Sequence, residues 1–192
     1  MIRALVAAAA IAGLAIATPR PASAGVLDIS TESCSSFLEG MKSQDKATQS
    51  DTFALLWWLD GYNLTEEQAT IIDFGAMKTN INNIIDDCSK NPTIALMTTS
   101  LKYMGANTSP KTSDVTDIAT MTCEQALASS QNNTEGMGYI LFWIAGYNAS
   151  FQKDTVFDSD KWDKVSGEIG DYCRANPKVG LLTTAKKYMN PE

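Results

Sequence analysis

The chain of 192 residues has no histidine at any position. Imidazole is the usual general base of enzymes, a common metal ligand and the side chain whose charge changes near neutral pH. No glycine-rich phosphate loop follows a predicted strand, and the cysteines are expected to form disulfides. We therefore predict no enzyme activity, no metal site and no cofactor. The groups left to respond to pH are carboxylates, which titrate only in acid.

Beyond its first 24 residues the sequence also lacks any apolar run long enough to span a bilayer. The N-terminal stretch has Arg3, an apolar run over residues 4–17 and an Ala-x-Ala site that ends at Ala24. Because the run is short and Pro19 follows it, this stretch is typical of a secretory signal rather than a transmembrane anchor. We predict a signal peptide over residues 1–24, cleavage after Ala24 and a soluble mature chain.

Basic side chains are in deficit, with 15 Lys and Arg against 22 Asp and Glu. Loss of the signal removes Arg3 and Arg20, which leaves 15 − 2 = 13 basic groups and a net charge of 13 − 22 = −9. An acidic surface repels nucleic acid and anionic membranes. We expect neither of them as a partner.

One sequence unit occurs twice. Its landmarks in the first copy, each repeated 85 residues later, are Trp58, Gly61, Tyr62, Cys88, Asn91, Pro92, Lys102, Tyr103 and Met104. A further cysteine precedes each copy, Cys34 and then Cys123, at an offset of 89. We predict two tandem domains, over residues 25–104 and 122–192. The segment between them, residues 105–121, is rich in Gly, Pro and hydroxyl residues and is interpreted as a linker.

Each repeat is too small to bury a large core alone, so we expect covalent cross-links within the repeats or association between them. Four cysteines in an exported chain indicate disulfides, and three pairings are possible. The repeat symmetry favours Cys34 with Cys88 and Cys123 with Cys173. Each bridge would close a loop of about 50 residues, which the chain-entropy model values at roughly 4 kcal/mol.

Apolar residues recur with helical spacing, and no run alternates with period two. We therefore predict an all-α fold of two tandem domains with about four helices each. One disulfide per domain would tie the first helix to the end of the third. A short helix is expected to run through Ile71 and Ile72. The last helix of each repeat is expected to begin at an Asn-Pro pair, Asn91-Pro92 in the first and Asn176-Pro177 in the second.

The most apolar helix of each repeat is predicted over residues 52–63 and around residues 139–145, and should be the buried centre of its unit. A glycine late in a helix costs about 1 kcal/mol relative to alanine. Close approach of another backbone is the expected compensation. We therefore assign Gly61, Tyr62, Gly146 and Tyr147 to domain packing. A ligand pocket lined by Trp58 and Tyr62 is the alternative interpretation.

The repeated motifs are Cys-x-x-Phe/Ala-Leu, Trp-x-x-Gly-Tyr-Asn and Cys-x-x-Asn-Pro, followed by a leucine-rich last helix. Together they resemble the HdeA/HdeB family of periplasmic acid-stress proteins, over residues 34–104 and 123–189. The resemblance implies a small helical fold with one internal disulfide. For the best-known members it also implies an ATP-independent chaperone that is a folded dimer near neutrality. In strong acid such a dimer dissociates, partly unfolds and holds other periplasmic proteins soluble.

From this resemblance we expect a periplasmic chaperone that opens at low pH, with acid-unfolded periplasmic proteins as partners. The two repeats are expected to pair within the chain, or the whole chain to dimerise. The client-binding candidates are the large apolar residues of the two central helices: Phe53, Leu55, Leu56, Trp57, Trp58, Tyr139, Leu141, Phe142 and Trp143.

Two other functions fit a small exported chain with disulfides and without a catalytic set. One is a periplasmic protein–protein inhibitor or immunity protein. The other is a carrier of a small apolar ligand in a Trp/Tyr cavity.

Overall fold

The computed structural model describes residues 25–64, 69–104, 113–132 and 134–189. The elements of the first repeat, in order, are β1 (Val26–Asp28), the 3-10 helix η1 (Ile29–Thr31), α1 (Cys34–Met41), α2 (Lys46–Asn63), β2 (Ile71–Asp73), α3 (Phe74–Lys90) and α4 (Leu96–Ser100). Those that follow are β3 (Val115–Asp117), α5 (Cys123–Asn132), α6 (Thr134–Gln152), β4 (Val156–Asp158), α7 (Ser159–Ala175) and α8 (Leu181–Met189). The predicted signal peptide lies outside the described residues.

The all-α class is confirmed, with four α-helices and one disulfide in each half of the described chain. Cys34 is bonded to Cys88, which joins α1 to the end of α3. Cys123 is bonded to Cys173, which joins α5 to α7 in the same way. Among the described helices, none is long and apolar enough to cross a membrane.

Helix caps place some helix boundaries away from their predicted positions. Asp45 accepts the N–H groups of Ala47 and Thr48, so α2 begins at Lys46 instead of residue 52. The prediction that Asn91 and Asn176 start the last helix of each repeat is wrong, because Asn91 ends α3 and Asn176 ends α7. Asn91 ends α3 by donating its backbone N–H to the Asp87 carbonyl at 2.9 Å, and α4 begins at residue 96. Asparagine stabilises either end of a helix, so the Asn-Pro pair alone does not decide between them.

The prediction of a helix through Ile71 and Ile72 is also wrong, because both residues lie in β2. Four short strands share the pattern aliphatic-x-Asp and form two antiparallel pairs, β1 with β4 and β2 with β3. Each pair takes one strand from each half of the chain. Three residues are too few to reveal period-two alternation, and the pairing partner lies far away in the sequence.

Part of the expected linker is packed structure as well as a connection. Residues 113–121 include β3, which lies 89 residues after β1, the same offset that separates the two N-terminal cysteines. Ile118, directly after β3, is completely buried. Its N–H donates to the carbonyl of Thr70 at 2.8 Å, as the N–H of Ile29 does to Thr155.

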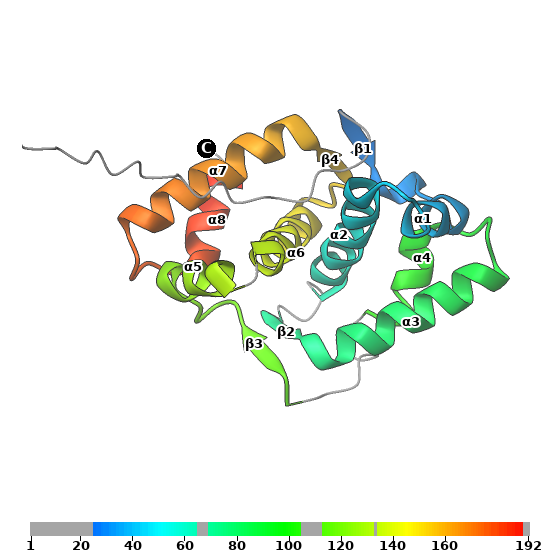
Figure 1. Cartoon of the computed structure of the whole chain (residues 1–192), viewed down its shortest axis with the longest axis horizontal. Helices are drawn as coiled ribbons and strands as arrows, with labels where there is room; N and C mark the ends of the chain where they lie inside the picture. Colours follow the sequence, from blue (N-terminus) through cyan, green and yellow to red (C-terminus); the bar gives the residue numbers. More distant parts are fainter. Residues whose placement is uncertain (1–24, 65–68, 105–112, 133, 190–192) are drawn as a thin grey trace, which may run out of the picture.

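The two long helices α2 and α6 lie side by side at the centre of the molecule (Figure 1). Helices α1, α3 and α4 pack around α2, whereas α5, α7 and α8 pack around α6. The paired strands lie at two separate edges, β1–β4 beside one end of the central helices and β2–β3 at another. A single hydrophobic cluster runs through both halves. The two repeats are thus arranged as an intramolecular pair.

Candidate functional site at the junction of the repeats

The backbones of α2 and α6 meet at two glycines. A Cβ atom added to Gly61 would lie 2.0 Å from the carbonyl oxygen of Trp143. One added to Gly146 would lie 1.9 Å from the carbonyl oxygen of Trp58. No side chain fits at such distances, so only glycine permits this crossing. Each Trp-x-x-Gly motif therefore supplies both the glycine for one side of the contact and the carbonyl that the other glycine meets.

Aromatic rings extend the contact along both helices. The ring of Tyr62 stacks on Trp58 at a centroid distance of 4.9 Å, and that of Tyr147 stacks on Trp143 at 5.4 Å. Between the halves, the ring of Tyr139 in α6 stacks on Trp57 in α2 at 5.6 Å. Such aromatic pairs add about 0.5–1.5 kcal/mol each to the burial of their area.

The closed arrangement covers most of the client-binding candidates. Six of them are buried: Leu56, Trp57, Trp58, Leu141, Phe142 and Trp143. The other three are half-buried and pack against the same core: Phe53, Leu55 and Tyr139. Their apolar surface is therefore mostly occupied by the protein itself, and a client could reach it only after the core opens.

A buried carboxylate lies in this junction, and the sequence analysis missed it. Asp60 in α2 is 6% exposed, and its Oδ2 accepts the indole N–H of Trp143 in α6 at 2.9 Å. Burial raises the pKa of Asp60 to about 7, the Trp143 hydrogen bond opposes that rise, and the negative charge of Asp73 adds to it. The position equivalent to Asp60 is Ala145. An acidic residue inside the most apolar predicted helix was the signal available in the sequence.

Matching polar contacts close the two strand pairs. Thr155 donates its hydroxyl to Asp28 Oδ1 at 2.9 Å, and Thr70 donates its hydroxyl to Asp117 Oδ1 at 2.7 Å. Each bond joins the first half of the chain to the second. Hydroxyl donors from Ser30 and then Thr155 lower the pKa of Asp28 below its ordinary value.

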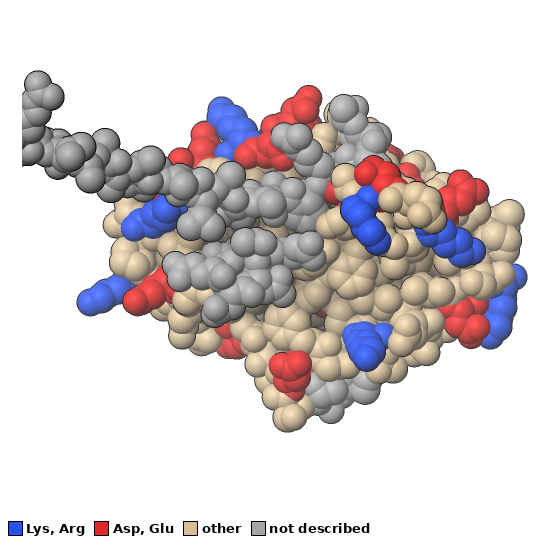
Figure 2. Space-filling view, in the orientation of Figure 1, with Lys and Arg blue, Asp and Glu red and all other residues tan. Residues whose placement is uncertain are grey.

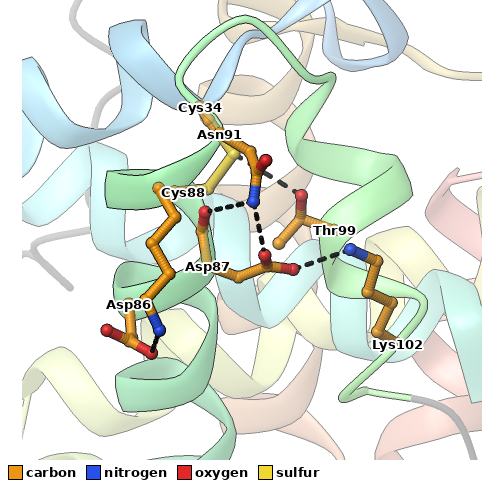
Figure 3. A network of polar contacts seen from close by, with 8 residues as sticks. Cys34, Asp86, Asp87, Cys88, Asn91, Thr99 and Lys102 are labelled. Atoms are coloured by element: carbon orange, nitrogen blue, oxygen red, sulfur yellow. Dashed lines mark hydrogen bonds and ion pairs between the residues drawn. A yellow bond between two sulfur atoms is a disulfide. The ribbon is translucent and has the colours of Figure 1, made fainter.

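Near the first disulfide, a polar network joins the end of α3 to the turn after α4 (Figure 3). Asp87 Oδ2 lies 2.8 Å from the ammonium of Lys102, and Asp87 Oδ1 accepts the side-chain amide of Asn91 at 2.9 Å. The hydrogen bond from Lys102 is the main cause that lowers the pKa of Asp87. Thr99 packs its hydroxyl 3.5 Å from the sulfur of Cys34 beside this network.

A pocket of about 250 Å³ lies between β4, α6 and α7, and Trp58 contributes to its wall. Tyr62, the second residue of the predicted ligand pocket, is not part of this lining. The aromatic rings that border the pocket belong to residues only 2–6% exposed: Trp58, Phe157 and Trp162. They offer little ring surface to a ligand, so the geometry favours these aromatics as core residues.

The face shown in Figure 2 has Lys and Arg interspersed with Asp and Glu, mostly around its outline. No broad basic patch that could follow a nucleic-acid backbone is visible on that face.

Comparison with known proteins identifies a family. The model of the HdeA/HdeB family matches the chain twice, at residues 1–98 and at residues 93–183. No curated protein and no solved structure matches the chain. The two matches follow the duplicated helices, disulfides and Trp-x-x-Gly crossing described above. The chain therefore belongs to the HdeA/HdeB family, as a tandem member with two repeats.

Proposed function

We propose that this protein is a periplasmic, ATP-independent chaperone of acid stress, without enzyme activity, which opens at low pH and holds unfolding proteins soluble. One observation carries the proposal. The most apolar helix of each repeat is packed against that of the other, and each disulfide joins two cysteines of the same half, so neither bridge links the two halves. The two halves can therefore separate, and uncover these helices, without breaking a covalent bond.

Acid supplies the driving force for opening. As the pH falls below about 4, the carboxylates become protonated and the net charge of the mature chain moves from −9 toward 13 positive charges. The bases then repel each other across the molecule. Asp28 adds to the effect. Because its folded-state pKa is lowered, its stabilising contribution is present above about pH 4 and is lost as the pH falls through that lowered pKa.

Asp60 opposes opening when the pH falls, so we expect the halves to separate only in strong acid. Its folded-state pKa is raised to about 7, so the folded state takes up a proton before the unfolded state does. Its contribution to stability is full below about pH 4 and is lost as the pH rises toward 7. Mild acidification therefore stabilises the contact between α2 and α6. Only the protonation of other carboxylates, in stronger acid, can then separate the two helices.

After opening, α2 and α6 would offer their aromatic and aliphatic side chains to the apolar segments of clients. The disulfides would limit the expansion of each half, while the positive charge keeps the complex soluble. On return to neutrality the halves close again, because the chain between them keeps their effective concentration high.

The test is an aggregation assay with the mature chain, residues 25–192, and an aggregation-prone client. Client light scattering and hydrophobic-dye binding are followed at about pH 2.5 and at about pH 7. We expect suppression of aggregation and strong dye binding in acid only. Unchanged aggregation in acid at a molar excess of the chain would overturn the proposal. A tight stoichiometric protein partner at neutral pH would instead support an inhibitor.

A further inference from the structure

Lys102 and Lys187 occupy the same position in the two repeats but have different partners. The ammonium of Lys102 lies 2.8 Å from Asp87 Oδ2, at the C-terminal end of α3. That of Lys187 in α8 lies 5.0 Å from the ring centroid of Tyr172, which stands in α7 at the position equivalent to Asp87. Lys102, in the turn directly after α4, thus connects that turn to α3, and Lys187 connects α8 to α7. In the first repeat the tie is an ion pair, and in the second it is a cation–π contact.

The ion pair of the first repeat depends on an ionised Asp87. The charged groups that act on this carboxylate are Lys102 and Lys90, and Asn91 donates a hydrogen bond to it. Tyr103 lies near both lysines and acts on their pKa values. These neighbours lower the pKa of Asp87, with the hydrogen bond from Lys102 as the largest cause. The stabilisation is therefore present above about pH 4 and is lost in stronger acid, when the two lysines remain as neighbouring positive charges.

The contact in the second repeat joins an ammonium to an aromatic ring and contains no carboxylate. A cation–π contact of this kind does not depend on an ionised carboxylate. Lys187 also lies 5.5 Å from the ring centroid of Tyr188, whose ring is 5.7 Å from that of Tyr172. The tie between α7 and α8 therefore remains in acid.

The ion pairs of the second repeat that the structure describes do not join two elements. Arg174 pairs with Asp171, and Lys164 lies 4.0 Å from Glu168, in both cases within α7. All four side chains are well exposed, and such pairs contribute little to stability. Their loss in acid leaves the packing of α8 on α7 unchanged.

Release of α4 also bears directly on the central helix. The side-chain amide of Asn63, the last residue of α2, donates to the hydroxyl of Ser100 in α4 at 3.2 Å. Both side chains are buried. A movement of α4 that breaks this bond would uncover the C-terminal end of α2.

We propose that the two repeats open at different pH values as acid is added, with α4 leaving α3 in the first repeat while α8 stays packed on α7 in the second. The proposal rests on the proposed function only in taking acid as the trigger. The first repeat then acts as the acid sensor, and the second repeat stays folded while the first one opens.

Hydrogen–deuterium exchange of the oxidised mature chain tests this order, with mass spectrometry of peptides over α4 and α8 and correction for the intrinsic pH dependence of exchange. We expect α4 to lose protection at a higher pH than α8. Between the two midpoints, exchange in α4 should exceed its neutral value by about threefold or more, the size of effect typical of a partly exposed ion pair. Equal midpoints, or earlier loss in α8, would overturn the proposal.

Substitutions at the two lysine contacts test whether these contacts determine the order in which α4 and α8 lose protection. Asp87→Asn should raise exchange in α4 at neutral pH by about threefold and remove most of its acid dependence. Tyr172→Asp should make exchange in α8 acid-dependent and move its midpoint toward that of α4. Asp86→Asn, which removes an exposed ion pair with Lys90 in α3, is the matched control and should leave both midpoints unchanged. Unchanged acid dependence of α4 in Asp87→Asn contradicts the proposal.

The aggregation assay separates this proposal from the proposed function. Ordered opening without protection of a client would keep the inference and refute the chaperone function. If a client is kept from aggregating while α4 and α8 lose their exchange protection at the same pH, the chaperone function is supported and the proposed order of opening is refuted.

Discussion

The two repeats share their backbone plan but differ at two carboxylates of the first repeat. Within the residues that the structure describes, both have four helices, one disulfide at matching positions and one glycine in the crossing of α2 and α6. They differ at Asp60, which corresponds to Ala145, and at Asp87, which corresponds to Tyr172. The shared residues include the glycines of the central crossing, to which both repeats contribute alike. The residues that differ include the carboxylates on which the proposed order of opening depends.

Removal of either disulfide should give the largest loss of stability. The bonded cysteines are 54 and 50 residues apart in the two repeats, so the chain-entropy model gives each bridge about 4 kcal/mol. We expect Cys34→Ala/Cys88→Ala and Cys123→Ala/Cys173→Ala to lower the free energy of unfolding by similar amounts. Urea unfolding followed by circular dichroism measures both. A large loss of unfolding free energy in one double variant and none in the other would show that the two disulfides do not stabilise their repeats equally.

Substitution of either central glycine should have the next largest effect. The new Cβ atom of Gly61→Ala or Gly146→Ala would overlap a backbone carbonyl, and a backbone atom cannot turn away as a side chain does. Each variant should lose about 3 kcal/mol or more and bind hydrophobic dye at neutral pH, because α2 and α6 are pushed apart.

Gly167→Ala is the matched control for these two variants. Gly167 lies in α7, is exposed, and would place its Cβ within 4 Å of no other group. An exposed helical glycine replaced by alanine gains about 0.5–1 kcal/mol. Equal behaviour of Gly61→Ala and Gly167→Ala would contradict the close crossing of the central helices.

Replacement of Asp60 should change the pH dependence of stability more than stability itself. Between about pH 7 and pH 4 the raised pKa of Asp60 should add up to about 1.4 kcal/mol for each unit of acidification. Asp60→Asn keeps an acceptor for the Trp143 N–H but cannot titrate, so this slope should disappear. Unfolding titrations at several pH values measure it. Glu39→Gln, at an exposed position in α1, is the control and should retain the wild-type slope.

The smallest effect is expected at the two strand pairs. Thr155→Val and Thr70→Val remove the hydroxyl donors to Asp28 and Asp117 while keeping a β-branched side chain. Each should lower the melting temperature by a few degrees at neutral pH, and the Thr155→Val effect should fade in acid because Asp28 is then protonated. An unchanged melting temperature at neutral pH in both variants would contradict a role of these bonds in closure.

Much of the helical framework was predictable because its signals are local or repeated. The helical spacing and the duplicated cysteine positions led to the all-α class and to the disulfide pairs that the structure confirms. The strands were missed because each has only three residues and pairs with the other half of the chain. Asn91-Pro92 was placed at the wrong helix end because its decisive partner, Asp87, lies in the preceding helix. Asp60 was missed because its raised pKa depends on burial, which a single sequence does not report.

In the proposed function, the surface hidden between α2 and α6 is the surface that protects clients. Its most direct test is one pH titration of the mature chain in the presence of an aggregation-prone client, with tryptophan emission and client light scattering recorded together. Trp58 and Trp143 are 2% and 0% exposed in the closed molecule, so their emission should shift to longer wavelength when the halves part. We predict that protection begins at the pH of this shift, below about pH 4. Protection while both tryptophans remain buried, or exposure without protection, would contradict the account.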